Sequence, residues 1–339
     1  MNRNTMIAIA AVVLIAFAGI GVWFLVQSPE SRPSTTEITV ATYPNQLPAL
    51  IYVARDRGFF AAKGLNVTIR YYDTGAASVD AMLAKEADVG LASEYVFARN
   101  VMNGRNITAL GSVAKTRDIC LIGRTDRGIR APADLAGKKI GLPTRTATEY
   151  YLSRYLQLNG IPSEDVTVVN VPTAQISDAL ANGTVDGVVI VQPVAGAVMS
   201  RLGTNAIMWP AQGGQSYFWI LTGREEWAKG HTDEITRFLE ALVPAENYLA
   251  TDPQGAKSGV ARELGYDDAY IEQVWSESQF SLSLDQSFIT AMEDEARWMI
   301  ANNMTDAESI PDFTQYISTE SLERVKPGSV YFIVGRGRP

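Results

Sequence analysis

From Ile38 onward, short apolar runs typical of β-strands alternate with stretches whose apolar residues recur at the spacing of one helix face. Parallel strands need a crossover between them, so this alternation restricts the chain to an α/β fold. The strand-like runs are 38–43, 66–72, 89–92, 107–114 and 119–124, then 139–142, 166–171, 187–191 and 206–209. The helix-like runs are 47–58, 76–85, 94–102, 147–159, 176–182 and 195–202. The two series predict two lobes, each with a parallel sheet covered by helices.

The order of the runs also predicts where the chain passes between the lobes. The first crossing is expected near 124–137 and the return near 217–224. The residues after the return are mainly helical in pattern, and we expect these helices to pack on lobe 1. The expected helices are 232–250, 253–264, 267–276 and 284–302. The expected domains are lobe 1 at 38–124 and 223–325, lobe 2 at 125–222, and a tail at 326–339.

The chain begins with a long apolar segment, Met6–Val26, which has 21 residues and no charge. At 1.5 Å per residue, a helix of this length spans a bilayer core of about 30 Å. A cleaved secretory signal is the alternative, but its apolar core would be shorter, and no A-x-A site follows Val26. We therefore expect a membrane anchor, with residues 1–5 in the cytoplasm, a linker at 27–37 and the body on the extracytoplasmic face. If the segment is cleaved, the body is secreted or periplasmic.

Composition excludes several functions. The formal net charge is −8 and no run of lysine or arginine occurs, which argues against a nucleic-acid partner. The single cysteine, Cys120, lies in an apolar strand-like run and is expected to be a small core residue. The single histidine, His231, rules out a histidine-rich metal site, and no G-x-S-x-G, P-loop or H-E-x-x-H motif occurs. We expect no catalytic residue, no metal and no cofactor.

Open parallel sheets bind ligands beyond the carboxyl ends of their strands, so the loops after the strands are the candidate site. The turn "PTRTATE" at 143–149 joins a strand to a helix. Thr146 and Glu149 have the spacing of a capping box, which explains both without a ligand. Thr144, Arg145 and Thr148 are not needed for capping. A helix N-terminus with added hydroxyls and a guanidinium suits phosphate, sulfonate or carboxylate, although a solvated arginine is an equal alternative.

Other loops after strands supply polar and aromatic candidates. Asp73, in the loop after the second strand, either caps the following helix or binds a cation, and capping is preferred. Tyr217 and Trp219 alternate in a strand near the return crossing, where aromatic residues are more often core than ligand cage. With those of the turn at 143–149, the candidate ligand-binding residues are Tyr43, Asn45, Gln46, Thr74, Gly75, Ala76, Ser93, Glu94, Tyr95, Lys115, Thr144, Arg145, Thr146, Thr148, Gln192 and Tyr217.

Four segments in the same order resemble a known family. They are "LPALIYVARDRGFFAAKGLNV" at 47–67, "AMLAKEADVG" at 81–90, "DLAGKKIG" at 134–141 and "ALANGTVDGVVIVQP" at 179–193. The chain resembles, over roughly residues 39–224, the substrate-binding proteins of ABC transporters for nitrate, sulfonates and taurine, a type that also includes binders of thiamine-pyrimidine precursors. The resemblance implies a class II periplasmic binding protein-like fold with a central ligand cleft.

The resemblance also implies a function and partners. The protein would capture a small anionic ligand of the nitrate, sulfonate or taurine class between its lobes and deliver it to an ABC permease with its ATPase subunit. We expect a monomer attached to the membrane through its N-terminal helix. A thiamine-pyrimidine or flavin precursor is the alternative ligand, because Tyr43, Tyr95, Tyr217 and Trp219 suit a flat ring. A pyrimidine-precursor synthase or lyase on the same fold, and a sensory ectodomain, are the competing functions.

Overall fold

The computed structural model describes residues 35–332, and residues 1–34 and 333–339 lie outside this description. The chain divides into two compact units, Met1–Thr36 and Glu37–Pro339, and the fold belongs to the second unit. The anchor predicted at 6–26, most of the predicted linker and the last residues of the predicted tail therefore fall outside the described residues. Within residues 35–332, no helix is both long enough and apolar enough to cross a membrane.

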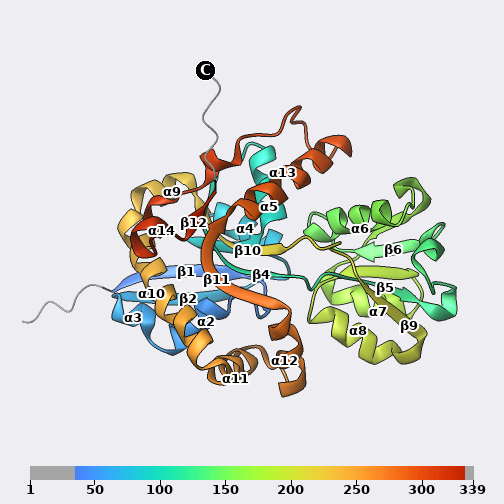
Figure 1. Ribbon diagram of the computed structural model, residues 1–339, viewed down its shortest axis with the longest axis horizontal. Helices are drawn as coiled ribbons and strands as arrows, with labels where there is room; N and C mark the ends of the chain where they lie inside the picture. The colour runs from blue at the N-terminus through green and yellow to red at the C-terminus, as the bar shows by residue number, and fades with distance from the viewer. Residues whose placement is uncertain (1–34, 333–339) are drawn as a thin grey trace, which may run out of the picture. The chain divides into compact units, whose positions relative to one another are not determined.

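Lobe 1 is built on a seven-stranded sheet with the strand order β12-β11-β4-β10-β3-β1-β2 (Figure 1). The bounds of these strands are β1 Thr36–Thr42, β2 Leu65–Tyr71, β3 Val89–Ser93, β4 Ile107–Thr116, β10 Tyr217–Arg224, β11 Ser278–Asp285 and β12 Val330–Tyr331. Strand β10 runs antiparallel to both of its neighbours, β3 and β4, whereas β1 and β3 are parallel.

The helices of lobe 1 come from both ends of the described chain. Helices α10 and α11 pack on α2, and α13 packs on α5, so the C-terminal helices cover lobe 1 as predicted. Their bounds are α2 Ala49–Asp56, α3 Phe59–Ala62, α4 Gly75–Leu83, α5 Glu94–Met102, α9 Glu225–Gly230, α10 Thr232–Thr251, α11 Pro253–Leu264, α12 Asp268–Ser276, α13 Gln286–Ala301 and α14 Glu320–Val325.

Lobe 2 is built on a five-stranded sheet with the order β7-β6-β8-β5-β9 (Figure 1). Its strands are β5 Cys120–Arg124, β6 Lys139–Leu142, β7 Thr167–Asn170, β8 Gly187–Ile190 and β9 Ala206–Pro210. Its helices are α6 Ala147–Leu158, α7 Ile176–Ala181 and α8 Val194–Leu202. Successive residues of β5 enter different cores: Leu121 joins the main core, whereas Cys120 and Ile122 join a smaller one. Both faces of this sheet are buried along the inner strands β5, β6 and β8, as their continuous apolar runs require, whereas the edge strands β7 and β9 are partly exposed.

The strands place the two crossings between the lobes at residues 117–119 and 211–216. Strand β4 ends at Thr116 in the seven-stranded sheet, and β5 begins at Cys120 in the five-stranded one. On the return, β9 ends at Pro210 and β10 begins at Tyr217 in the sheet of lobe 1. The predicted boundaries at 124/125 and 222/223 are wrong by one strand each, because each crossing strand pairs with the sheet that it enters.

The prediction of wholly parallel sheets is also wrong. Strand β5 is antiparallel to β8 and β9, and β10 is antiparallel to β3 and β4. A helical crossover returns the chain to the same end of a sheet and so makes the next strand parallel. No helix separates β4 from β5 or β9 from β10, so these strands can enter their sheets in the opposite direction.

Candidate ligand-binding site

A cavity lies where loops of both lobes meet. Its volume is about 40 Å³, which is room for a few water molecules or a small ligand. Lobe 1 and the first crossing supply Tyr43, Asn45, Asp73, Thr74, Gly75, Ala76, Ser93, Val96, Ile119, Tyr217 and Trp219. Lobe 2 supplies Pro143, Thr146, Ala147, Thr148, Thr173, Ile190 and Val191. The loops after β1, β2, β3, β6 and β8 all contribute, as expected for a site at the carboxyl ends of strands.

Three helix N-termini meet at this cavity, and each is capped by a hydroxyl. In α4 the Thr74 side chain accepts a hydrogen bond from the Ala77 backbone N–H at 3.0 Å, so the expectation that Asp73 caps this helix is wrong. In α5 the cap is Ser93, and in α6 it is Thr146. The cap or first-turn residues of all three helices line the cavity. The positive ends of three helix dipoles therefore face one small space, which favours a negative group there.

The turn before α6 differs from a full capping box. Thr146 is the cap, but the Glu149 carboxylate accepts from the Arg145 backbone N–H at 2.8 Å. The Thr146 hydroxyl donates to the Pro143 carbonyl at 2.8 Å and lies 2.7 Å from the Thr148 hydroxyl. Both hydroxyl protons therefore have acceptors inside the turn. Within residues 35–332, the Ala147 backbone N–H has no hydrogen-bond acceptor, because the first residue of a helix has no carbonyl of its own helix to bond.

The sequence-predicted residues divide into two groups. Those that line the cavity are Tyr43, Asn45, Thr74, Gly75, Ala76, Ser93, Thr146, Thr148 and Tyr217. The others, Gln46, Glu94, Tyr95, Lys115, Thr144, Arg145 and Gln192, are not part of its lining. Whether the first group binds ligand stays a prediction.

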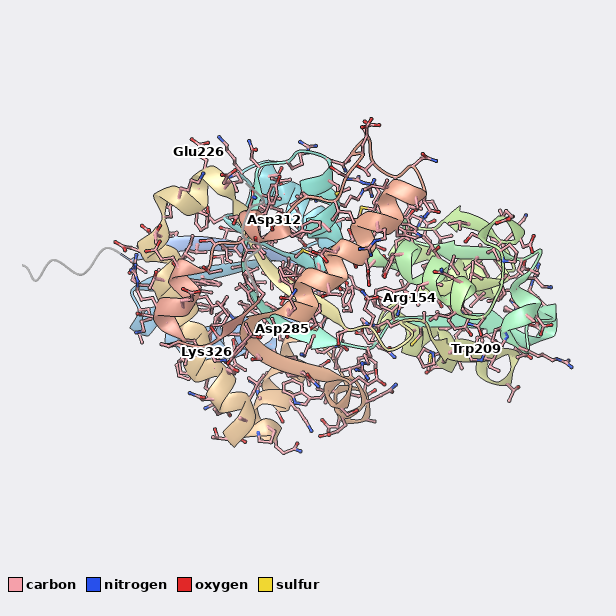
Figure 2. The ribbon with its side chains drawn as sticks, turned by 45° about the horizontal axis from the view of Figure 1, so that its top comes forward. Arg154, Trp209, Glu226, Asp285, Asp312 and Lys326 are labelled. Carbon is pink, nitrogen blue, oxygen red and sulfur yellow. The ribbon has the colours of Figure 1, made fainter. Side chains whose placement is uncertain are left out.

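The two predicted cations are engaged elsewhere. Lys115 forms an ion pair at 3.4 Å with Asp285, which Figure 2 labels, and neither residue is part of the cavity lining. Arg145 has a mostly exposed side chain and lies 3.6 Å from Asp80 of α4, so this pair bridges the two lobes outside the cavity. Neither side chain is therefore placed to hold an anion inside the cavity.

Three predicted residues of lobe 1 are buried, and two of them, Gln46 and Glu94, form hydrogen bonds with protein groups. The Gln46 amide donates to the Asp118 carboxylate at 3.3 Å. The Glu94 carboxylate accepts from the Phe218 backbone N–H at 2.9 Å, and the Tyr95 ring packs in the core. Burial raises the pKa of Asp118 to about 7, against the lowering effect of the Gln46 bond.

The remaining two predicted residues serve loops of lobe 2. The Thr144 backbone N–H donates to the Asn170 side chain at 3.1 Å, which ties the ends of β6 and β7 together. The Gln192 side chain accepts from the Gly196 backbone N–H at 3.0 Å and from the Tyr270 hydroxyl of lobe 1 at 3.3 Å. Gln192 is thus a contact between the lobes.

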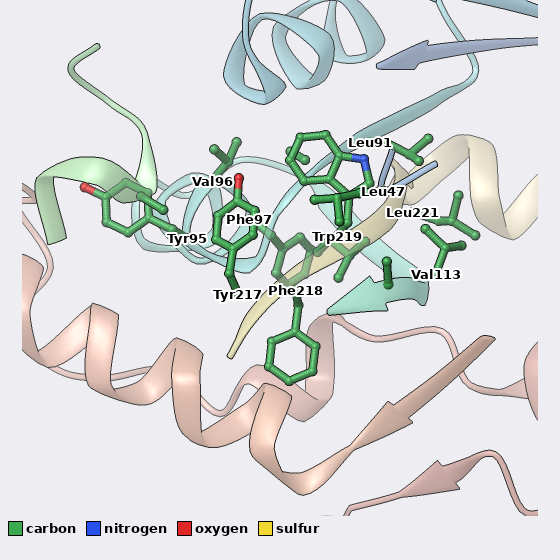
Figure 3. Close-up of a cluster of buried hydrophobic side chains, with 14 of the residues drawn as sticks. Leu47, Leu91, Tyr95, Val96, Phe97, Val113, Tyr217, Phe218, Trp219 and Leu221 are labelled. Carbon is green, nitrogen blue, oxygen red and sulfur yellow. The ribbon is translucent and has the colours of Figure 1, made fainter. Parts of the chain in front are cut away.

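Aromatic rings form much of the lobe 1 wall. Tyr217 and Trp219 lie on one face of β10, with ring centroids 6.0 Å apart, while Phe218 points to the other face (Figure 3). A Cβ atom on Gly75 would lie 3.0 Å from the Trp219 ring and 3.1 Å from the Ala92 backbone, so any other residue there would push these neighbours back by a few tenths of an ångström. Trp219 is missing from the candidate set because aromatic residues in a strand are more often core residues, and in the structure it is buried and also lines the cavity.

Some lining residues were not among the candidates although a signal existed. Thr173 follows the end of β7, and Ile190 and Val191 end β8, so the carboxyl-end rule points to all three. Ile119 lies in the first crossing, which the sequence placed later in the chain. Within residues 35–332, no cluster of three His, Cys, Asp or Glu side chains could hold a metal ion.

Two α/β lobes with a small cavity between them are the architecture of periplasmic binding proteins. Residues 45–256 match the model of the family described as NMT1/THI5 like, and the chain belongs to this family. This match confirms the resemblance to ABC-transporter substrate-binding proteins that the four sequence segments indicated. The chain is 25% identical to the taurine-binding periplasmic protein of Escherichia coli over 257 residues, which cover 74% of this chain and 73% of that protein. It is 25% identical to the formylaminopyrimidine-binding protein of Halalkalibacterium halodurans over 48% of this chain and 49% of that protein.

Solved structures show the same fold. The alkanesulfonate-binding protein SsuA from Xanthomonas axonopodis pv. citri, bound to MOPS, superposes with a TM-score of 0.70 at 18% identity, covering 84% of this chain and 98% of that one. The desulfurization enzyme DSZB superposes with a TM-score of 0.59 at 17% identity, covering 85% of this chain and 99% of that one. Together with the family match, these similarities support a role in binding a small ligand, and the fold itself occurs in both binding proteins and enzymes.

Proposed function

We propose that this protein is the extracytoplasmic substrate-binding component of an ABC importer. It holds a small anionic ligand of the sulfonate, taurine or nitrate class between its lobes and presents it to a permease and its ATPase subunit. The observation that carries the proposal is the meeting of the α4, α5 and α6 N-termini at one cavity. Because α6 belongs to lobe 2 and the other two helices to lobe 1, an anion there stabilises contact between the lobes.

Binding of an anion in this cavity does not require an arginine or lysine. No cationic side chain is among the lining residues that the structure describes. Backbone N–H groups at helix N-termini hold sulfonate, phosphate or carboxylate without one. The names of the taurine-binding and alkanesulfonate-binding relatives agree with an oxyanion of this kind.

The alternative ligand is a flat heteroaromatic molecule such as a thiamine-pyrimidine or flavin precursor. The observation that favours it is the aromatic wall of Tyr43, Tyr217 and Trp219. The name of the formylaminopyrimidine-binding relative agrees with a flat ring as ligand. A ring stacked on this wall would depend on the aromatic side chains, whereas a bare oxyanion would depend on the helix N-termini.

An enzyme on the same fold is the competing function, and the likeness in fold to a desulfurization enzyme gives it a specific form. The test is release of sulfite from sulfonates or sulfinates incubated with the purified protein. Steady release would favour the enzyme and contradict a pure binding role.

The proposal also includes the anchor at residues 6–26 and a monomeric state. Mass spectrometry of the membrane fraction tests the anchor, and light scattering tests the monomeric state.

The decisive experiment removes one backbone donor. Ala147 is the first residue of α6, and Thr146 before it is extended, so proline can replace Ala147 without breaking the helix. Titration calorimetry would compare the wild type, Ala147→Pro and the control Ala147→Gly, which keeps the N–H, with taurine, alkylsulfonates, nitrate, aminopyrimidines and riboflavin. Hydrogen bonds to charged groups contribute about 1.5–3 kcal/mol. Ala147→Pro should therefore raise the Kd of an anion roughly ten- to hundred-fold, and Ala147→Gly should not. Binding of an aminopyrimidine alone, unchanged in Ala147→Pro, would favour the heteroaromatic ligand.

A further inference from the structure

Asp73 is the one charged side chain among the cavity-lining residues that the structure describes. It follows β2 and directly precedes Thr74, the cap of α4. The Thr74 hydroxyl takes the capping bond that Asp73 was expected to make. Within residues 35–332, the Asp73 carboxylate has no hydrogen-bond or ion-pair partner. A charge that serves neither a cap nor an ion pair faces the space where a ligand would lie.

The field around Asp73 is negative. The pKa of Tyr43 is raised to about 12, first by burial and then by the negative charges of Asp118 and Asp73. The predicted cations Lys115 and Arg145 are not part of the cavity lining, and they lie beside Asp285 and Asp80. A simple anion such as nitrate would gain from the helix N-termini and lose to Asp73, since each helix end carries only about half an elementary charge.

The cavity lining thus carries charge of both signs. The N-termini of α4, α5 and α6 supply positive partial charge, and Asp73, which directly precedes the Thr74 cap of α4, supplies negative charge. The rings of Tyr43, Tyr217 and Trp219 also belong to the lining, and ring faces attract cations. A ligand that satisfies both signs carries a negative and a positive group a few bonds apart.

We propose that the ligand is a zwitterion, with its anionic head group at the helix N-termini and a protonated amino group at Asp73. This inference rests on the proposed function, because it assumes that the cavity binds an anionic head group. Asp73 then acts as the residue that selects amino-bearing anions over plain ones. The class comprises short amino acids and aminosulfonates whose amino group is not on the carbon that bears the acid.

The test uses pairs of ligands that differ only in replacement of the ammonium by a methyl group. Taurine is paired with propane-1-sulfonate, and β-alanine with butyrate. Titration calorimetry on the purified full chain measures the ratio of the two Kd values within each pair. In the wild type, at least one zwitterion should bind ten-fold or more tightly than its partner. Asp73→Asn should bring that ratio close to one, by weakening the zwitterion and not the plain anion.

Two further variants control the experiment. Asp80→Asn makes the same change on α4 outside the cavity lining and should leave the ratio as in the wild type. Asp73→Glu keeps the charge and should retain part of the preference. Because Asp73 is exposed at the rim, circular dichroism should show an unchanged fold in both Asp73 variants.

The outcomes separate the two proposals. If the plain anions bind as tightly as the zwitterions, and Asp73→Asn leaves every ratio unchanged, the zwitterion inference is overturned while the anion-binding function stands. If no member of either pair binds, the proposed anionic ligand fails, and the zwitterion inference fails with it.

Discussion

Lobes 1 and 2 both present helix N-termini to the cavity, yet they differ in what they bury. Lobe 1 encloses Glu94 of α5 and Glu295 of α13 completely, and both oxygens of Glu295 lack a hydrogen-bond partner within residues 35–332. Between residues 120 and 210, in lobe 2, the buried polar side chains are the uncharged Thr148 and Gln192. Charged side chains of lobe 2 lie at its surface, where Arg201 and Asp178 form an ion pair.

This difference makes a pair of buried carboxyl groups a source of pH sensitivity in lobe 1. The pKa of Glu295 is raised well above its usual value by burial first, then by the charges of Glu94 and Asp294. The pKa of Glu94 is also raised by burial, against three backbone hydrogen bonds that lower it. Two carboxyl groups that resist ionisation in the folded state make the stability of lobe 1 depend on pH in the neutral range. Lobe 2 has no such pair.

The largest expected effect comes from Glu295→Gln. In the unfolded chain both carboxyl groups ionise near pH 4.5, whereas in the folded protein they stay protonated to a higher pH, so the free energy of unfolding falls as pH rises from 5 to 8. Glutamine cannot ionise and removes part of this fall. The variant should match the wild type at pH 5 and exceed it by on the order of 2–4 kcal/mol at pH 8, measured by urea unfolding.

The matched control for this prediction is Glu164→Gln in lobe 2, at an exposed position. It should change the free energy of unfolding by less than about 0.5 kcal/mol at either pH. A pH-dependent gain in stability from Glu164→Gln, or none from Glu295→Gln, would break the contrast between the lobes.

The next effect compares helix caps. Thr74→Ala in lobe 1 removes one capping bond to Ala77, with an expected cost of about 1 kcal/mol. Thr146→Ala in lobe 2 also removes the bond to the Pro143 carbonyl and the contact with the Thr148 hydroxyl, so its cost should reach about 2 kcal/mol. Both costs should be the same at pH 5 and pH 8 when measured by chemical unfolding. Equal costs would mean that the hydroxyl network of lobe 2 contributes nothing beyond capping.

The smallest effect concerns the ion pair that joins the lobes. Arg145 and Asp80 are 3.6 Å apart, and both side chains are more than half exposed. Exposed pairs contribute about 0–1 kcal/mol. A double-mutant cycle with Arg145→Ala and Asp80→Ala should therefore give a coupling energy below about 0.5 kcal/mol, at low salt and with or without ligand. A larger coupling seen only with ligand would show that the pair stabilises the ligand-bound form.

Local periodicity predicted most elements, because an apolar face is visible in a short window. Strand β11 was missed although Phe280, Leu282 and Leu284 alternate in it, since the helical pattern of α13 was extended back to Leu284. The direction of β5 and β10 could not be predicted, because it depends on which sheet each strand joins rather than on its own residues.

The sequence predicted the lining residues best where a helix cap fixes their position, and worst where the position of a side chain depends on its ion-pair partner. Thr74, Ser93 and Thr146 line the cavity because they cap helices after strands, a position that the sequence shows. Arg145 and Lys115 carry the right charge, but they lie outside the cavity lining, beside Asp80 and Asp285 of distant segments. Such pairings between distant segments leave no mark in the local sequence.

One buried side-chain amide, that of Gln212, joins the two crossing segments between the lobes. The Gln212 side chain, in the return crossing, accepts from the Ile119 backbone N–H at 2.9 Å and donates to the Thr116 carbonyl at 3.1 Å. The Ala211 backbone N–H also donates to the Ile119 carbonyl at 2.9 Å. These bonds join the two crossing segments to each other. We therefore expect the angle between the lobes to change by rotation about the joined segments rather than by sliding of one lobe past the other.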